Sequence, residues 1–550
     1  MTEPFDLVIR NARIVDGTGN PYYLAHIALS QGRIMKIDRC VNPGRAEKII
    51  DADGLIACPG FFDSHSHDDA YLMAKPSCDD KVLQGVTTEV IGNCGYSLAP
   101  LSEEHHADLR NIVRILGGDH MPEHVWKIRS FADYLAELEG VKPGINVVPL
   151  VGHAAIRIAV MGMEQRDPTE GEMGEMKGLT TRAMEEGAFG LSAGLVYVPA
   201  NYAKTEEIIE LVRIVGQYRG LYTTHLRSEG DDVMEAMDEA LRIGQAGDVP
   251  VVISHHKVMG QGNWGRSVET LQKLREARAA GQEVVCDQYP YTAASTYLAA
   301  LLPPSVQAGG YKAYSEKLKG LNLRRAVVEQ IEDDARSQWE NVIKAAGFEG
   351  VVISIAQRHS EYLGKSIAEI ARFEGKDPYD VFFDLLVEEG EGVGAILHTM
   401  DERDVQRILK DPMTMIGTDG FPDFGESKVH PRQTGTFPRI LGRYVREQGL
   451  ISLEEAIRKM TSLPAQTFRV KKKGLLKEGL DADIVIFDPE TVLDRATFDD
   501  PRQQPEGIVW VLINGQVAVE KGRVTGEARG KVMRYNSEKE SPCQKTYIAS

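Results

Sequence analysis

The chain has 550 residues, enough for one very large domain or about two to four ordinary ones, and its 42% hydrophobic and 26% charged content is typical of a soluble globular protein. The net charge of −18 argues against a nucleic-acid partner, and no basic stripe or zinc-finger spacing is present. No stretch approaches the roughly 18 apolar residues of a membrane span. We therefore expect a small-molecule substrate and no membrane association.

The N-terminal stretch MTEPFDLVIRNARIVDG has neither a basic start nor a long apolar run, so we expect no signal peptide and a cytoplasmic location. The cysteines are irregularly spaced, which does not indicate a disulfide framework: Cys40, Cys58, Cys78, Cys94, Cys286 and Cys543. We expect reduced thiols, which can bind metals or act as nucleophiles. The oligomeric state cannot be read from the sequence.

The two ends of the chain share a pattern of short alternating strands separated by Gly and Asp. Residues 1–58 contain DLVIRNARIVDGTG and KIIDADGLIACPG, and residues 475–550 contain DADIVIFDPE and GIVWVLINGQVAVEKGRVT before a C-terminal tail. We predict one small β-sandwich that is built from both ends.

Between the two ends, strand-like runs alternate with helical patterns such as EEIIELVRIVGQYR and VETLQKLREARAA. Eight strand candidates occur in chain order: GFFDSHSHD, TTEVIGNC, INVVPLVGH, AFGLSAGLVY, LYTTHLRSE, VPVVISHHK, EVVCDQYPY and MTMIGTDG. This α/β pattern predicts a (β/α)8 TIM-like barrel over residues 59–296 and 401–474. Residues 297–400 are too long for one loop, so we predict an inserted subdomain that is a candidate lid.

Metal-ligating side chains follow several of these strands: His65, His67, Cys94, His225, His255 and Asp419. Active sites lie at the carboxyl ends of barrel strands, and His65 and His67, two residues apart, face the same side. Imidazole, thiolate and carboxylate ligands with one open position suit zinc. Taken alone, Cys94 could also be a nucleophile or a buried small hydrophobic residue.

The stretch FFDSHSHD resembles the HxH motif of the amidohydrolase superfamily, which pairs a (β/α)8 barrel with a small β-sandwich. Its ligands follow strands one, five, six and eight, which matches His65, His67, His225, His255 and Asp419. Many branches carry a carboxylated lysine on strand four, but AFGLSAGLVYVP has none, and Cys94 offers the bridging negative charge instead. With THLRSEG, SHHK, YPYTAAST and HPRQTGTFPR, the chain resembles the D-aminoacylase family, the N-acyl-D-amino-acid deacylases.

This resemblance implies zinc-dependent hydrolysis of N-acyl-D-amino acids to a carboxylate and a free D-amino acid. It implies a tight zinc site at Cys94, His225 and His255, with His65 and His67 forming a second, weaker site or acting near the scissile carbonyl. Asp419 would be the general base and acid, and His67 would help stabilise the oxyanion. The substrate carboxylate would contact four residues: Lys257, Tyr289, Ser295 and Arg432.

Another amidohydrolase reaction is the alternative, such as D-dipeptide or cyclic amide hydrolysis, and a metal-free scaffold is a third.

Several residues stay open. Arg227 and Glu229 could support His225 or form an ordinary ion pair, and His153 could line the pocket or be structural. We take His256 to face away from the site, Asp287 to be structural and His105–His106 to be solvated. The glycines of GQGNWG (260–265) match GxGxxG, but the position directly after a candidate ligand favours a loop over the pocket.

Overall fold

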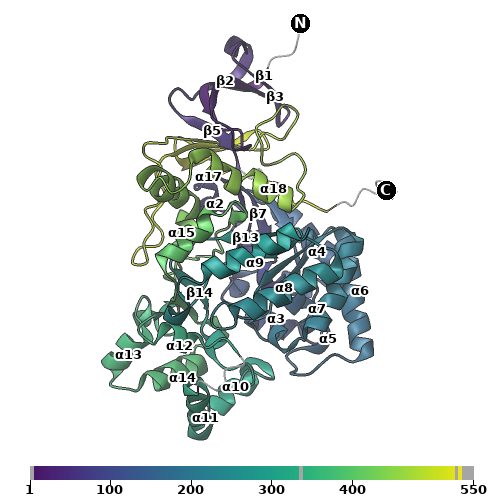
Figure 1. Cartoon of the computed structure of the whole chain (residues 1–550), viewed down its shortest axis with the longest axis vertical. Coiled ribbons are helices and arrows are strands. Elements are labelled where there is room, and N and C mark those ends of the chain that lie inside the picture. Colours follow the sequence, from purple (N-terminus) through teal and green to yellow (C-terminus); the bar gives the residue numbers. More distant parts are fainter. Residues whose placement is uncertain (1–4, 334–338, 527–529, 536–550) are drawn as a thin grey trace.

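The computed structural model describes residues 5–333, 339–526 and 530–535. Three parts follow one another along its long axis: the strands of the chain ends, the barrel, and an insertion at the opposite end that carries helices α10–α14 (Figure 1). Cys543 and much of the predicted C-terminal tail lie outside the described residues. The barrel therefore lies between the β-sheet unit and the insertion.

Both ends of the chain contribute to one nine-stranded sheet. Antiparallel pairing of Ile484–Phe487 with Ile56–Pro59 joins the two halves, and β1 pairs with β2, β4 and β5, so the sheet branches there. This is the predicted β-sandwich. Its strands are β1 Phe5–Ile14, β2 Tyr23–Ser30, β3 Arg33–Asp38, β4 Ala46–Asp51, β5 Ile56–Pro59, β18 Ile484–Phe487, β19 Ile508–Ile513, β20 Gln516–Glu520 and β21 Arg523–Val524.

All eight predicted barrel strands are present, and all pair in parallel. The third is interrupted at Leu150, and the barrel closes between the last and first strands, where Ser64 N donates to Ile416 O and Ser66 bridges to Gly420. The strands are β6 Phe61–Asp63, β7 Val86–Ile91, β8 Asn146–Pro149 with β9 Val151–Gly152, β10 Gly190–Gly194, β11 Leu221–His225, β12 Val251–Ile253, β13 Val284–Gln288 and β17 Thr414–Ile416.

Helices cover the outside of the barrel, as the helical spacing of apolar residues predicts. In α7, for example, Ile208, Leu211, Val212 and Val215 recur at i, i+3, i+4 and i+7 and are buried. The barrel helices are α1 Asp69–Ala74, α2 Asp79–Val82, α3 His106–Ile112, α4 Phe131–Val141, α5 His153–Met161, α6 Glu170–Glu186, α7 Thr205–Gln217, α8 Val233–Gly247, α9 Ser267–Ala279, α15 Glu402–Lys410, α16 Arg432–Arg439, α17 Leu453–Met460 and α18 Ser462–Thr467.

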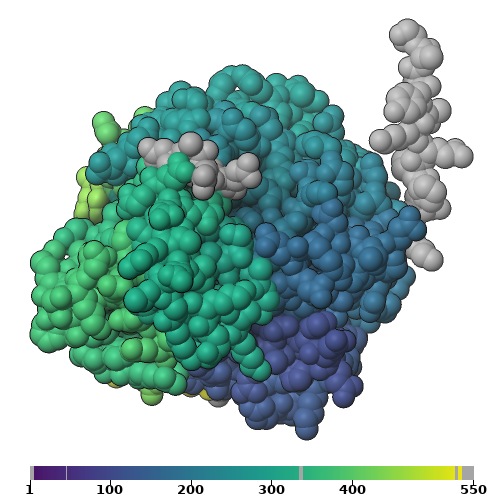
Figure 2. Space-filling model, turned by 90° about the horizontal axis from the view of Figure 1, so that it is seen from below, coloured from purple at the N-terminus to yellow at the C-terminus, as the bar shows by residue number. Residues whose placement is uncertain are grey.

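The insertion contains a small antiparallel sheet in the order β14-β16-β15, with its own apolar core. Its sheet begins at Ala293, slightly before residue 297. Seen from this end, the insertion in teal and green packs against the blue segments of the barrel (Figure 2). Its elements are β14 Ala293–Tyr297, α10 Gly310–Leu318, α11 Leu321–Glu332, α12 Val342–Ala346, β15 Val351–Ile355, α13 Ile367–Glu374, α14 Pro378–Glu388 and β16 Gly394–His398.

Two further features concern the described part of the chain. None of its helices has the length and apolar character needed to cross a membrane. Its five cysteines, from Cys40 to Cys286, are free thiols, in line with the irregular spacing in the sequence.

A completely buried charge cluster joins the first and last barrel strands. Lys81 Nζ lies 2.7 Å from Asp63 Oδ2, 3.1 Å from Asp68 Oδ2 and 3.7 Å from Glu89 Oε2, and it donates to Thr418 Oγ1 at 2.7 Å. Asp63 Oδ1 accepts from Thr418 N at 2.8 Å. The cluster thus fixes the strand ends that are followed by the HxH motif and by Asp419.

Lys81→Met is expected to lower the free energy of unfolding by about 3–5 kcal/mol, because it leaves buried carboxylates without their cation. Chemical denaturation measures the change. Lys36→Met is the control, since Lys36 is half exposed and lies 3.6 Å from Asp38, a surface pair worth at most about 1 kcal/mol. Equal, small effects of both substitutions would contradict a structural role for the cluster.

Candidate metal centre and active site

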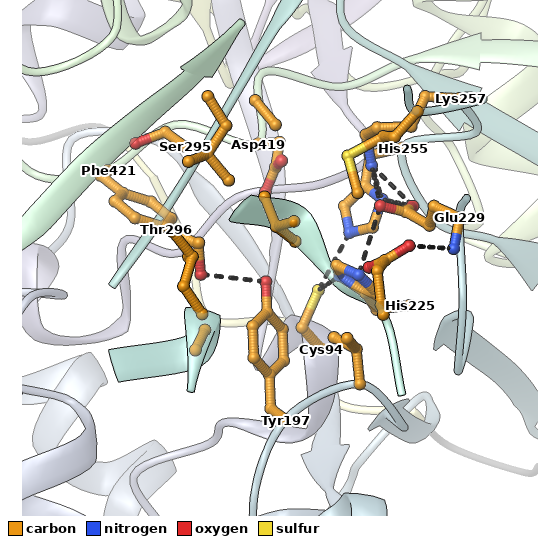
Figure 3. Close-up of a pocket in the computed structure, with 18 of the residues that line it drawn as sticks. Cys94, Tyr197, His225, Glu229, His255, Lys257, Ser295, Thr296, Asp419 and Phe421 are labelled. Carbon is orange, nitrogen blue, oxygen red and sulfur yellow. Dashed lines mark hydrogen bonds and ion pairs between the residues drawn. The ribbon is translucent and has the colours of Figure 1, made fainter. Parts of the chain in front are cut away.

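The six predicted metal-ligating residues come together at the carboxyl ends of the barrel strands, and all of them except His65 line a pocket that residues of the insertion also line. Cys94, His225, His255 and Asp419 are labelled in this pocket in Figure 3. Each is less than 10% exposed: His65, His67, Cys94, His225, His255 and Asp419. They follow β6, β7, β11, β12 and β17, so the chain brings them together from positions more than 350 residues apart. Their proximity follows from the closure of the barrel.

The thiol of Cys94 is the centre of this group. Its Sγ lies 3.4 Å from His65 Nε2, 3.4 Å from His255 Nε2 and 4.0 Å from His225 Nδ1. Burial raises the pKa of Cys94 well above its usual value, so the thiolate needs a nearby cation. Three imidazoles around one buried thiol form a donor set that a metal cation satisfies.

Asp419 faces the same nitrogen of His65 as Cys94 does. Its Oδ1 is 3.2 Å from His67 Nε2 and 3.5 Å from His65 Nε2, and its Oδ2 is 2.7 Å from Arg432 Nη1. Burial by itself would raise the pKa of Asp419, but Arg432 and the surrounding imidazoles hold it well below its usual value. The carboxylate is therefore ionised at neutral pH.

Glu229 connects two of the imidazoles to Lys257. Its Oε1 lies 3.0 Å from His255 Nδ1 and its Oε2 lies 3.3 Å from His225 Nε2, while Lys257 Nζ lies 2.6 and 2.8 Å from the two oxygens. All four side chains are buried. Glu229 thus holds both rings in position with their other nitrogen atoms directed toward Cys94.

The residues predicted to bind a substrate carboxylate lie next to one another. The guanidinium of Arg432 lies 4.5 Å from the centre of the Tyr289 ring and its Nη2 is 3.4 Å from Ser295 O, while Lys257 Nζ lies 5.7 Å from the same ring. Among the described residues, Tyr289 Oη has no hydrogen-bond partner although it is buried. An anion that accepts from Tyr289 would satisfy this hydroxyl.

The donor atoms fit a metal ion in three overlapping sets, within each of which they lie within 4.8 Å of one another. The sets are His65–Cys94–His255, His65–His67–Asp419 and His225–Glu229–His255. Burial lowers the pKa of His65 and His255 to about 3, so both rings are neutral, the form that binds metals. Cys94, His225 and His255, which are predicted to hold the tight zinc ion, do not all belong to one of these sets.

Comparison with known proteins agrees with this geometry. The model of the amidohydrolase family matches residues 48–519. The chain belongs to the amidohydrolase family. It is 40% identical to a D-aminoacylase of Alcaligenes xylosoxydans xylosoxydans over 97% of this chain and 98% of that protein. It is 38% identical to an N-acyl-D-aspartate deacylase of the same organism, over 96% and 95% of the two chains.

A solved structure is also similar. The N-acyl-D-glutamate deacylase from Bordetella bronchiseptica, complexed with zinc and a phosphonate inhibitor that mimics the tetrahedral intermediate of the reaction, superposes with a TM-score of 0.81. Its sequence is 36% identical, and the match covers 97% of this chain and 100% of that chain. The resemblance to the D-aminoacylase family and the predicted barrel-plus-sandwich fold are both confirmed.

The backbone of this amidohydrolase adopts left-handed conformations at three of the six residues. Cys94, His255 and Asp419 have φ values of 52°, 35° and 47°. Such values are uncommon for residues other than glycine and concentrate at functional sites. The surrounding fold has to hold each of these turns.

Neighbouring residues hold the left-handed turn at Cys94 in place. Gly92, two residues before Cys94, has a φ of 76°, and a Cβ at this position would lie 2.2 Å from Leu150 O. Ser192 on β10 accepts from Gly95 N at 3.0 Å and donates to Gly92 O. The lysine-free strand four therefore supplies a hydroxyl that secures the turn carrying the thiol.

Asp287 is the site residue that sequence reasoning missed, since we expected it to be structural. Its Oδ1 accepts from His255 N at 2.6 Å and lies 3.4 Å from His65 Nδ1, and burial raises its pKa to about 7. It is the penultimate residue of strand β13, which ends at Gln288, and it is buried. The strand-end rule that selected the other residues could have selected it too.

The residues left open are now placed. Glu229 contacts the imidazoles, whereas Arg227 forms an ordinary ion pair with Glu239 at 2.8 Å. His153 pairs with Glu207 at 2.8 Å inside the fold, and His256 faces Thr270 Oγ1 at 2.9 Å. His105 and His106 are partly exposed, and residues 260–263 line a second pocket that shares Met259 and Glu340 with the first.

Proposed function

We propose that this amidohydrolase hydrolyses the amide bond of N-acyl-D-amino acids, releasing a carboxylate and a free D-amino acid in a zinc-dependent reaction. One observation carries the proposal: a buried thiol faces three imidazoles in a barrel whose fourth strand has no lysine, in a chain 40% identical to a D-aminoacylase. The predicted cytoplasmic location stays a prediction.

Cys94, His225 and His255 are proposed as ligands of a tight zinc site, and His65 and His67, with Asp419, as a second, weaker one. Two imidazoles and a thiolate suit zinc and leave a position open. The neutral imidazole of His255 and the contacts of Glu229 with His255 and His225 favour this role. His65 lies as close to Cys94 as His255 does, which supports two neighbouring sites that share the thiol.

Bound zinc supplies Lewis acidity, which lowers the pKa of water toward neutrality and polarises the amide carbonyl. Asp419 is proposed as the general base that takes the proton of the attacking water and returns it to the leaving amine. Its ionised carboxylate, held through Oδ2 by Arg432, leaves Oδ1 for this proton. His67, 3.2 Å from Oδ1, is proposed to stabilise the oxyanion.

Lys257, Tyr289, Ser295 and Arg432 are proposed to position the α-carboxylate of the substrate. Lys257, Tyr289 and Ser295 line the pocket, and Arg432 lies against the ring of Tyr289. Two cations and two hydroxyl-bearing side chains suit a carboxylate. Glu229 already pairs with Lys257, and Asp419 already pairs with Arg432. A substrate carboxylate that binds here would therefore share these cations with the two protein carboxylates. Tyr289 Oη contributes a donor that has no other acceptor among the described residues.

An amine-release assay tests the proposal with matched N-acetyl-D- and N-acetyl-L-amino acids, a D-dipeptide and a hydantoin. We expect hydrolysis of the N-acetyl-D-amino acids and little of the others. Faster turnover of the L-series or of the cyclic amide would contradict the proposed reaction.

Glu229→Gln is expected to weaken zinc binding by about 10–100-fold, because the ring orientation of His225 and His255 and the charge of Lys257 lose their partner. Zinc competition with a chelator measures the change. Glu239→Gln is the matched control, since Glu239 pairs with Arg227 and touches none of the ligands. Equal zinc affinity in both variants would show that Glu229 does not orient the imidazoles.

A further inference from the structure

The insertion gives the pocket an apolar wall. Ala300, Leu301, Val342 and Leu397 line the pocket from the insertion, and Met259 continues the wall from the barrel. Leu301, Val342, Leu397 and Met259 are less than 7% exposed and belong to the apolar core of the insertion. The side chains of this wall carry neither a charge nor a hydrogen-bond donor.

The two cations near the pocket, Lys257 and Arg432, already form ion pairs with carboxylates. Lys257 is the only lysine or arginine among the described residues that line it, and both oxygens of Glu229 bind its ammonium. Arg432, completely buried behind Asp419, pairs with that carboxylate at 2.7 Å. Both cations flank the ring of Tyr289, where they can serve one α-carboxylate.

The insertion contributes one ionisable side chain to the pocket among the described residues, and it is acidic. Glu340 is 9% exposed, and its Oε1 accepts a hydrogen bond from Glu229 N. On the side of the insertion, a second carboxylate would thus meet the apolar wall, the carboxyl group of Glu340 or the hydroxyls of Ser295 and Thr296, none of which is positively charged. Burying a carboxylate there without a cation is costly.

We propose that this site is selective for N-acyl-D-amino acids with neutral, apolar side chains and discriminates against aspartate and glutamate. The proposal rests on the proposed function and narrows its substrate class. In this proposal both the acyl group and the amino-acid side chain of the substrate contact the apolar wall. Neither group meets an unpaired cation among the described residues that line the pocket.

The test compares kcat/KM of the zinc-loaded, full-length enzyme for the N-acetyl derivatives of D-methionine, D-glutamine, D-glutamate and D-aspartate. We expect D-methionine to exceed D-glutamate by at least about 100-fold. D-glutamine, a neutral isostere of D-glutamate, should fall between them, which separates charge from shape. D-glutamate or D-aspartate hydrolysed as well as D-methionine would overturn the selectivity but leave the proposed reaction standing. Hydrolysis of none would overturn both.

Val342 offers a second measurement. Val342→Lys adds a cation to the apolar wall and is expected to raise the D-glutamate to D-methionine ratio of kcat/KM by about tenfold. Val342→Met, of similar length but uncharged, should leave the ratio near that of the wild type. The same ratio in both variants would contradict the assignment of this wall. The wild-type comparison decides the selectivity even where a variant fails to fold.

Discussion

Asp419→Asn is expected to lower kcat by about 10²–10⁴-fold, the usual contribution of general acid–base catalysis, while zinc stays bound. Asparagine keeps the shape of the side chain but cannot accept the proton of the attacking water. Oδ2 is fixed by Arg432 at 2.7 Å and Oδ1 lies 3.2 Å from His67 Nε2, so the substitution changes chemistry more than position. Steady-state kinetics and zinc content per chain, measured on the same preparation, check both halves of the expectation.

Asp423→Asn is the control for this prediction. Asp423 follows the same strand but pairs with Arg502 at 2.6 Å, away from the imidazoles, and its replacement should leave kcat near that of the wild type. Turnover near the wild-type rate in Asp419→Asn would refute the assignment as general base. Loss of zinc together with activity would instead show that Asp419 acts mainly as a metal ligand.

The candidate ligands could be predicted from the sequence because two simple rules apply to them. Barrel strands end at one face, and residues two apart in a strand, such as His65 and His67, point the same way. Both rules use only local pattern and strand order. The strand-end rule applies equally to Asp287, the penultimate residue of β13, although from the sequence we predict a structural role for it.

The contacts that hold the ligands in place could not be predicted in this way. Ser192 secures the turn of Cys94 from a strand 97 residues further along, and Lys81 reaches Thr418 across 337 residues. No periodicity connects such partners. The left-handed backbone at Cys94 has no sequence signal either, since residues other than glycine rarely adopt it.

The strand pairing inside the insertion could not be predicted from the sequence either. Its helices and the strand VVISIA were visible as patterns, but β14 pairs with β16 across about a hundred residues, as in Ala293 with His398. Pairing over such a distance is not encoded in local alternation. The apolar wall and Glu340 consequently became visible only in the folded chain.

Cys94→Ala is expected to weaken zinc binding by more than the roughly 10–100-fold that loss of an outer partner costs, because it removes the one soft anionic donor. The thiol is the atom that His65, His225 and His255 share, at 3.4, 4.0 and 3.4 Å. Without it, the three imidazoles lose the anionic sulfur between them, and only the carboxylates of Asp419 and Glu229 remain to balance a divalent cation. Zinc content after purification, followed by chelator competition, measures the loss; the wild type should hold at least one zinc per chain.

Cys286→Ala separates this effect from the removal of any buried thiol. Cys286 is free and completely buried in barrel strand β13, where its Sγ contacts Thr414 Oγ1 at 3.4 Å and no imidazole. Both alanine variants remove one sulfur from the same barrel, so a comparable loss of stability is expected in each, but zinc should be lost only from Cys94→Ala. Unchanged zinc affinity in Cys94→Ala would show that Cys94 is only a buried small side chain and not a metal ligand. A wild-type protein that is fully folded without metal would contradict the proposed zinc-dependent activity. Because the carboxylated lysine of related branches has no counterpart on β10, the proposed zinc chemistry depends on the thiol.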